Sequence, residues 1–262
     1  MSKLALIIFV KVPILGLVKT RLSQTTCLND VDVTLLAEAM FKDTLVAASA
    51  SNADVIEIGF FPKTEFPRIK KIVDLVRTDE NLVTPINFSV QTGINFDERF
   101  SSIVSNSFER KNETIVILGA DLPYIDISTI NTAFQFLIAE QNKKRVVIGP
   151  AGGGGVYLVG ITDKFSPEWF VEYEIFRGGV EISQFVKLCE KEKVELDMLH
   201  PLTDIDIEED LVSLLAFIGT KDVVKHYSKF HFPKYTARVV KTLGLYIKEI
   251  PGETRLRKIG KR

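Results

Sequence analysis

The sequence lacks the short motifs that mark the commonest nucleotide-binding and hydrolytic sites. It contains neither the GxxxxGKS/T loop of P-loop proteins, nor the GxGxxG dinucleotide fingerprint, nor the GxSxG nucleophile elbow. Its three histidines, His200, His226 and His231, do not have the spacing of metal ligands. These absences exclude a Walker A NTPase and argue against a Ser–His–Asp hydrolase.

Cysteine and long hydrophobic runs are scarce as well. The two cysteines, Cys27 and Cys189, lie far apart without a CxxC pattern, which predicts buried free thiols in a reducing compartment; a disulfide or metal role is the alternative. The apolar run at 4–10 is too short to span a membrane, and no small-residue cleavage site follows it. We therefore expect a cytoplasmic protein with neither a signal peptide nor a transmembrane helix.

The small net charge of −1 conceals a strong asymmetry along the chain. Residues 217–262 carry eight Lys and four Arg against three acidic residues, a sum of +9, so residues 1–216 sum to −10. This shift predicts a catalytic domain at 1–216 and a basic C-terminal extension at 217–262, containing a helix at 236–242 and a hairpin at 245–259. A subunit contact, such as a homodimer interface, or an added lid is the favoured role for the extension; contact with an acidic substrate or, less favoured, with nucleic acid remains open.

Strands and helices alternate along the first 216 residues. Apolar or alternating runs predict strands, and residues with a period of 3.6 predict helices between them. Such alternation is typical of βαβ units, so the expected fold is a three-layer αβα sandwich with a mostly parallel sheet and ligands at the carboxyl ends of its strands. The expected strands are 4–10, 54–61, 87–91, 114–118, 145–148, 156–160 and 194–199, and the expected helices are 32–50, 67–76, 96–108, 128–140 (with Ser128 as its cap), 180–191 and 207–217.

The loop after the first strand is the strongest candidate for binding phosphate. It contains Gly16 and is flanked by three cations, Lys11, Lys19 and Arg21, before the chain enters a helix. A buried strand that ends in a basic, glycine-containing loop presents backbone N–H groups and positive charge to an anion.

Two acidic segments are candidates for binding a divalent cation. Asp121 follows a buried strand within Gly-Ala-Asp-Leu-Pro, and Asp204 and Asp206 point the same way if their segment is extended. Each of these three could instead cap a turn or a helix. For the acidic residues at 208–210, favourable placement at a helix N-terminus is the better interpretation.

Two glycine-containing segments complete the candidate site. Gly152–Gly155 could let backbone approach a ligand closely, with a mobile hairpin loop as the alternative. Gln91 and Gly93 end a predicted strand and could contact a ligand, whereas Glu98 and Arg99 could equally form an ion pair on a helix surface.

Five segments in order, FVKVPILGLVKTRL, QTGINFDERF, LGADLPYI, GPAGGGGVYLVGI and TDIDIEEDL, resemble a known family over about residues 4–215. These are the glycosyltransferase-A-fold transferases labelled radical-SAM/selenodomain-associated, which are related to 2-phospholactate and molybdenum-cofactor guanylyltransferases. The resemblance implies a nucleotide-diphospho-sugar-transferase-like fold with Mg²⁺ (or Mn²⁺) as cofactor. It implies catalytic roles for Lys19, Arg21 and Asp121; nucleotide binding by Lys11, Gly16, Lys19, Arg21, Gln91, Gly93 and Gly154; and metal binding by Asp121, Asp204 and Asp206.

The chain departs from the family where an Asp-Gly-Gly-Tyr run is usual, because it has Gly153 in place of the acid and Val156 in place of the ring. Three cations near one loop suit a triphosphate better than a diphospho-sugar. We therefore expect a nucleotidyltransferase that moves an NMP from an NTP to a small phosphorylated or acidic acceptor and releases pyrophosphate. A glycosyltransferase that uses an NDP-sugar is the first alternative, and a non-catalytic nucleotide-binding protein is the second.

Overall fold

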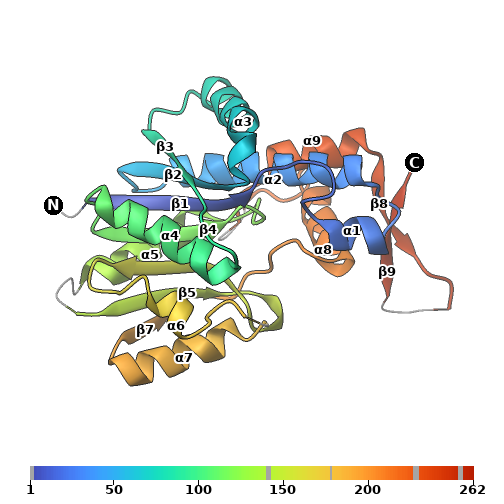
Figure 1. Ribbon diagram of the computed structural model, residues 1–262. Coiled ribbons are helices and arrows are strands. Elements are labelled where there is room, and N and C mark those ends of the chain that lie inside the picture. The colour runs from blue at the N-terminus through green and yellow to red at the C-terminus, as the bar shows by residue number, and fades with distance from the viewer. Residues whose placement is uncertain (1–2, 140–142, 178, 227–229, 253–255) are drawn as a thin grey trace.

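A computed structural model describes residues 3–139, 143–177, 179–226, 230–252 and 256–262. Its centre is a seven-stranded sheet in the order β3-β2-β1-β4-β6-β5-β7, covered by helices on both faces (Figure 1). Only β6 runs against its neighbours β4 and β5 within this sheet, so the sheet is mostly parallel, as predicted. The strands are β1 (Leu4–Lys11), β2 (Val55–Phe61), β3 (Ile86–Val90), β4 (Thr114–Gly119), β5 (Arg145–Pro150), β6 (Val156–Thr162) and β7 (Glu195–Met198).

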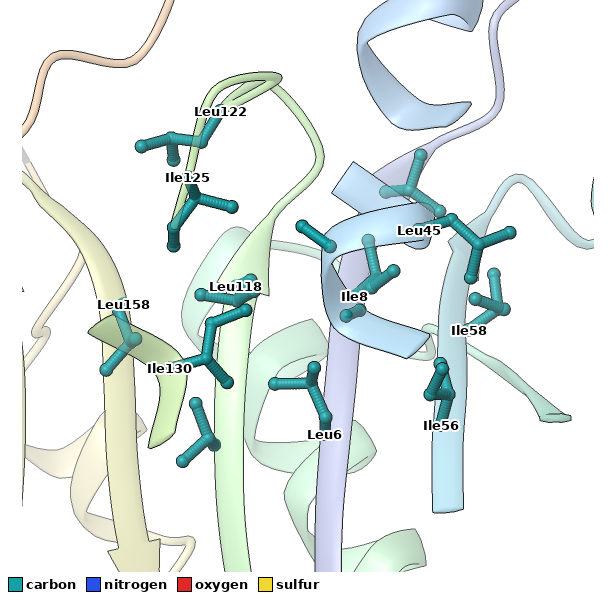
Figure 2. Packing of buried hydrophobic residues seen from close by; sticks show 14 of the residues in the cluster. Leu6, Ile8, Leu45, Ile56, Ile58, Leu118, Leu122, Ile125, Ile130 and Leu158 are labelled. Atoms are coloured by element: carbon teal, nitrogen blue, oxygen red, sulfur yellow. The ribbon is translucent and has the colours of Figure 1, made fainter. Parts of the chain in front are cut away.

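Strand β1 lies in the interior of the sheet because its side chains are apolar on both faces. Leu6 and Ile8 join the hydrophobic cluster on one face, while Ala5 and Ile7 join the cluster on the other. All four are fully buried, as expected for an unbroken apolar run in a parallel sheet. Figure 2 shows Leu6 and Ile8 packed with Ile58 of β2 in the first cluster.

Two sets of helices form the outer layers. Helices α2, α3 and α5 contribute to the first cluster, and α4, α6 and α7 contribute to the second. The helices of these layers are α2 (Asp30–Ser49), α3 (Phe66–Asp79), α4 (Phe96–Glu109), α5 (Ile127–Ala139), α6 (Trp169–Glu172) and α7 (Glu181–Glu192), with a short 3-10 helix η1 (Lys63–Glu65) before α3. The predicted helices therefore agree with the observed ones to within a few residues at each end.

Two local expectations are wrong. The cap of α5 is Asp126, whose carboxylate accepts hydrogen bonds from the backbone and hydroxyl of Ser128. The Asp126 carboxylate, two residues before Ser128, accepts from a free N–H group of the first helical turn, as an N-cap side chain does. Both cysteines are free, but only Cys189 is buried; Cys27 is exposed beside β9, where its thiol donates to the Ile259 carbonyl oxygen.

The C-terminal elements pack along α2 and share a hydrophobic cluster with α1. They are α8 (Glu208–Gly219), α9 (Lys234–Thr242) and the antiparallel pair β8 (Leu245–Glu249) and β9 (Arg257–Lys261), and they lie on the side opposite the N-terminus in Figure 1. The turn of the predicted hairpin includes residues 253–255, which lie outside the described residues. Val240 and Ile259 share a third hydrophobic cluster with Leu22 of α1 (Thr20–Thr25) and Leu36 of α2.

Asp43 of α2 ties α9 to the body of the protein. Its carboxylate is fully buried and accepts hydrogen bonds from the backbone N–H groups of Tyr235 and Thr236 and from the Thr236 hydroxyl. A side chain from another helix thus supplies the cap that α9 lacks locally. None of the helices in the described part of the chain is long and apolar enough to cross a membrane.

Candidate functional site

The carboxyl ends of β1, β3 and β4 open onto a cavity of about 440 Å³, which we call the first cavity. This is the edge at which parallel α/β sheets present ligand-binding groups. The candidate residues that line the first cavity are Lys11, Lys19, Arg21, Gln91, Asp121, Asp204 and Asp206. The predicted cations and carboxylates, which come from three separate segments of the chain, therefore meet in one place.

Lys19 occupies the centre of this arrangement. It precedes α1 in the left-handed region, at φ 50°, and its side chain is only 9% exposed. Its ammonium lies 2.7 Å from Asp121 Oδ2 and 3.8 Å from Asp206 Oδ1. Burial by itself lowers the pKa of Lys19, but the neighbouring carboxylates, Asp121 first, outweigh it and raise the pKa above its usual value. Lys19 is therefore held as a cation.

Arg21 extends from α1 into the same cavity. Its Nη1 lies 2.6 Å from Asp206 Oδ2, yet the side chain remains 70% exposed. Such a pair contributes little to stability, and both partners can exchange their contact for a ligand. The geometry thus provides one buried cation and one accessible cation within reach of the same carboxylate.

One or two of the carboxylates in the first cavity could hold a magnesium ion that phosphate also binds. Burial, together with the nearby charge of Asp121, raises the pKa of Asp204 to about 6, whereas the side chains of Asp121 and Asp206 are 32% and 40% exposed. Within the described residues, no group of three or more ligating side chains is arranged as a complete metal site. Mg²⁺ usually takes one or two protein carboxylates and completes its shell with water and phosphate oxygens, so this donor set is sufficient.

Gln91 and Gly93 organise the loop after β3. The Gln91 side chain is buried, and its amide nitrogen donates to the carbonyl oxygens of Val10 and Gly59, which leaves its carbonyl oxygen for a ligand. Arg99 donates to the carbonyl oxygens of Gly93 and Ile94 and stacks over the Phe61 ring.

The Glu98 carboxylate also binds this loop, because it accepts hydrogen bonds from the Ile94 N–H and from the Asn95 side-chain amide. Glu98 and Arg99 therefore bind the loop between β3 and α4 rather than forming the ion pair considered as an alternative. Gly16 and Gly93 do not line the first cavity; they shape the loops around it through positive φ angles.

A second cavity of about 430 Å³ adjoins the first and shares Phe9, Arg21, Phe96, Asp204 and Asp206 with it. The glycine run forms the 3-10 helix η2 (Gly152–Gly154), and Gly152 and Gly155 line this cavity. Gly154, for which nucleotide binding was predicted, has φ 89° and does not line either cavity.

Glu181, the first residue of α7, supplies a carboxylate to the second cavity. Its Oε2 atom is enclosed and has no hydrogen-bond partner among the described residues. Sequence reasoning did not select Glu181, because it belongs to none of the five motifs. The available signal was an acid placed directly after the Gly179–Val180 turn at a helix start.

Comparison with known proteins defines the fold. A family model described as "Uncharacterized protein conserved in bacteria (DUF2064)" matches residues 71–177, which include Asp121 but neither Lys19 nor Asp206. No curated protein matches the chain. A solved structure from Desulfovibrio desulfuricans G20, provisionally named a nucleotide-diphospho-sugar transferase, is 23% identical, with a TM-score of 0.70 over 92% of this chain and 95% of that one.

Two further solved structures are similar over most of their length. A cytidylyltransferase from Leptospira borgpetersenii serovar Hardjo-bovis (strain JB197) is 14% identical, with a TM-score of 0.52 over 92% of this chain and 95% of that chain. A 4-diphosphocytidyl-2C-methyl-D-erythritol synthase from Anaerococcus prevotii DSM 20548 is 12% identical, with a TM-score of 0.53 over 83% and 96%. The chain therefore has the nucleotide-diphospho-sugar-transferase-like α/β fold. The radical-SAM/selenodomain-associated type suggested by the motifs stays a prediction.

Proposed function

We propose that this protein is a Mg²⁺-dependent nucleotidyltransferase, which moves the nucleoside monophosphate of an NTP onto an acceptor and releases pyrophosphate. The observation that carries the proposal is the convergence of Lys19, Arg21, Asp121 and Asp206 on the first cavity, with Lys19 and Asp121 2.7 Å apart. Proteins of this fold whose names state an activity include cytidylyltransferases and a CMP-2-keto-3-deoxy-manno-octonic acid synthetase solved with CTP. These names support nucleotide chemistry on this scaffold.

The charges in the first cavity suit a magnesium-bound triphosphate. Its described lining contains four cations, Lys11, Lys19, Arg21 and Arg99, and three carboxylates, Asp121, Asp204 and Asp206. A bound Mg²⁺ adds two positive charges, and the resulting surplus of about three approaches the roughly four negative charges of an NTP. An NDP-sugar has about two negative charges and differs from this surplus by the same single charge, so the preference for an NTP rests on the fold's named nucleotidyltransferases rather than on net charge.

The ion pairs within the first cavity can be replaced by contacts with a bound nucleotide and metal. When phosphates enter, Lys19 and Arg21 can turn to phosphate oxygens while Asp121 and Asp206 become available to the metal. Mg²⁺ would supply charge neutralisation and orientation at the phosphates. The two cations then stabilise charge on the leaving pyrophosphate as an acceptor oxygen bonds to the α-phosphorus and the bond to the bridging oxygen breaks.

Glycosyl transfer from an NDP-sugar is the second candidate because of Glu181. The sequence lacks the family's usual acid at Gly153, but Glu181 brings a carboxylate to the second cavity near Gly155. A carboxylate aimed at an acceptor hydroxyl is what glycosyl transfer requires of a general base.

Thermal stabilisation by nucleotides separates these candidates. We expect one of the four NTPs to raise the melting temperature only when Mg²⁺ is present, and to yield pyrophosphate once an acceptor is supplied. Stabilisation by UDP- or GDP-sugars but by no NTP would favour glycosyl transfer instead. Binding of an NTP with no turnover of any acceptor would indicate the non-catalytic nucleotide-binding protein.

A further inference from the structure

We propose that the second cavity binds the acceptor and that the Glu181 carboxylate accepts a hydrogen bond from an acceptor hydroxyl group. The acceptor is then an uncharged, hydroxyl-rich compound with one apolar face, of the sugar or polyol class. This inference rests on the proposed function and specifies its acceptor. It replaces the phosphorylated or acidic acceptor expected from the sequence.

An aromatic wall forms one side of the second cavity. Phe176 packs against Phe96 and Phe100, with ring centroids 4.8 and 4.5 Å apart, and Phe9 lies 5.1 Å from Phe96. All four rings line the cavity. Such a wall suits the C–H face of a ring-shaped ligand, while a few polar groups fix the orientation of the ligand.

Glu181 is the polar group that the protein itself leaves unsatisfied. Its Oε2 atom has no measurable exposure and no partner in the described part of the chain. A buried acceptor without a donor is unfavourable, so the arrangement is explained if a ligand supplies the donor. Gly155 leaves room for this, since a side chain there would begin 3.9 Å from Glu181 Oε2.

The charges that line the second cavity disfavour an anionic acceptor. Among the described residues of its lining, the only cation is Arg21, against the three carboxylates Asp204, Asp206 and Glu181. A phosphate or carboxylate placed there would face the Glu181 carboxylate, together with whichever of Asp204 and Asp206 the metal does not neutralise. A hydroxyl group donates to the same carboxylates without that repulsion.

The two cavities are placed for transfer between their ligands. Arg21, Asp204 and Asp206 belong to the walls of both, so an acceptor in the second cavity lies next to phosphates in the first. The acceptor hydroxyl oxygen can therefore approach the reacting phosphorus, and its proton passes to the Glu181 carboxylate as the new P–O bond forms and the bond to pyrophosphate breaks.

Acceptor binding can be measured separately from nucleotide binding. Saturation-transfer NMR on the full chain would compare methyl glucoside, glucose and inositol with their charged counterparts, glucuronate, glucose 6-phosphate and inositol phosphate. We expect the neutral compounds to bind and the charged ones to bind at least tenfold more weakly. Glu181→Gln should weaken neutral binding about fivefold and Glu181→Leu at least tenfold, whereas Glu190→Gln, the same charge change on the exposed side of α7, should have no effect.

The outcomes are distinct. Failure of every NTP to stabilise the protein would refute the proposed nucleotidyl transfer, whatever binds in the second cavity. The acceptor inference is overturned if nucleotide binds but none of the neutral compounds does, if the charged compounds bind as well as the neutral ones, or if Glu181→Leu leaves neutral binding unchanged.

Discussion

At the scale of single residues, the site depends on how Lys19 is held. A non-glycine residue at φ 50° is strained by about 1 kcal/mol or more, and the 2.7 Å ion pair with Asp121 offsets that cost. The same pair keeps both side chains extended into the first cavity. The ion pair between Lys19 and Asp121 therefore fixes both the conformation of the loop before α1 and the position of these two charges in the cavity.

Asp121→Asn tests the metal-binding role at this scale. The amide keeps a hydrogen-bond acceptor for Lys19 but loses the charge that a divalent cation requires. We expect Mg²⁺-dependent turnover to fall by about a hundredfold or more with an unchanged circular dichroism spectrum. Pyrophosphate release measured against Mg²⁺ concentration checks this, and wild-type turnover in the variant would remove Asp121 from the site.

Arg21→Ala tests the accessible cation. Because Arg21 is exposed and its pair with Asp206 is a surface pair, we expect little change in stability. Loss of one charge-assisted contact to phosphate should raise KM for the NTP about tenfold or more. Arg68→Ala, which breaks the pair with Glu38 and lies outside the lining of both cavities, is the matched control and should leave KM unchanged. Equal KM values for the two variants would contradict the assignment.

At the scale of elements, the loop between β3 and α4 shows how backbone shape supports the site. Gly93 has φ 135°, and a Cβ there would lie 2.5 Å from Glu98 Cβ. We expect Gly93→Ala to cost about 2 kcal/mol or more and to weaken nucleotide binding, since Arg99 and the loop must move. Gly16→Ala has open space around it and should cost only about 1 kcal/mol. Urea denaturation of both variants measures the difference, and equal losses would show that the close approach at Gly93 is tolerated.

The capping of α9 by Asp43 predicts a pH dependence of stability. Burial raises the pKa of Asp43 from 3.8 to about 6, despite the hydrogen bonds it accepts from Tyr235 and Thr236. Between pH 3.8 and about 6, Asp43 is protonated in the folded state but ionised in the unfolded state. The stability that this proton binding contributes is therefore fully present below about pH 4 and is lost as pH rises through about 6. The change amounts to roughly 3 kcal/mol.

Asp43→Asn cannot titrate and isolates this contribution. The free energy of unfolding of the wild type minus that of the variant should decline between pH 4 and 6 and level off above it. Guanidinium denaturation at a series of pH values measures the difference. A difference that is constant with pH would mean that Asp43 keeps an ordinary pKa in the folded protein.

Elements with strong local patterns could be predicted from the sequence. The apolar run of β1 identifies a buried strand, and the acid of Gly-Ala-Asp-Leu-Pro follows the end of another. Because the strands are parallel, the residues that follow them lie at one edge of the sheet. Glu181 could not be found this way, because its role depends on how the start of α7 packs beside Gly155. The aromatic wall could not be found either, because Phe96 and Phe176 are distant in sequence and no local pattern connects them.

At the scale of the whole molecule, the opposite charges of the two parts of the chain meet. Lys234 pairs with Glu80, and Lys261 lies 2.7 Å from Asp32. The basic extension thus neutralises part of the negative charge of residues 1–216. These contacts within the chain account for some of the positive charge that had suggested a binding partner for the extension. Hydrophobic contact reinforces this pairing, because Ile259 and Val240 complete a cluster begun by Leu36 and Leu22.

This shared cluster predicts that residues 217–262 unfold together with the rest of the chain, although the charge asymmetry suggested a boundary at 217. Trp169, the only tryptophan, lies in α6 with the second cluster, whereas Ile259 belongs to the third. Ile259→Ala should lower the free energy of unfolding by about 2–4 kcal/mol. If the chain unfolds as one cooperative unit, the transition that Trp169 fluorescence reports should shift by the same amount. If the Trp169 transition stays in place while circular dichroism shows an earlier partial transition, the extension is an independent unit. Leu22→Ala, a truncation in α1 within the same cluster, should give the same coincident shift in both signals, since either truncation weakens the contact between the extension and helix α1, which carries Arg21.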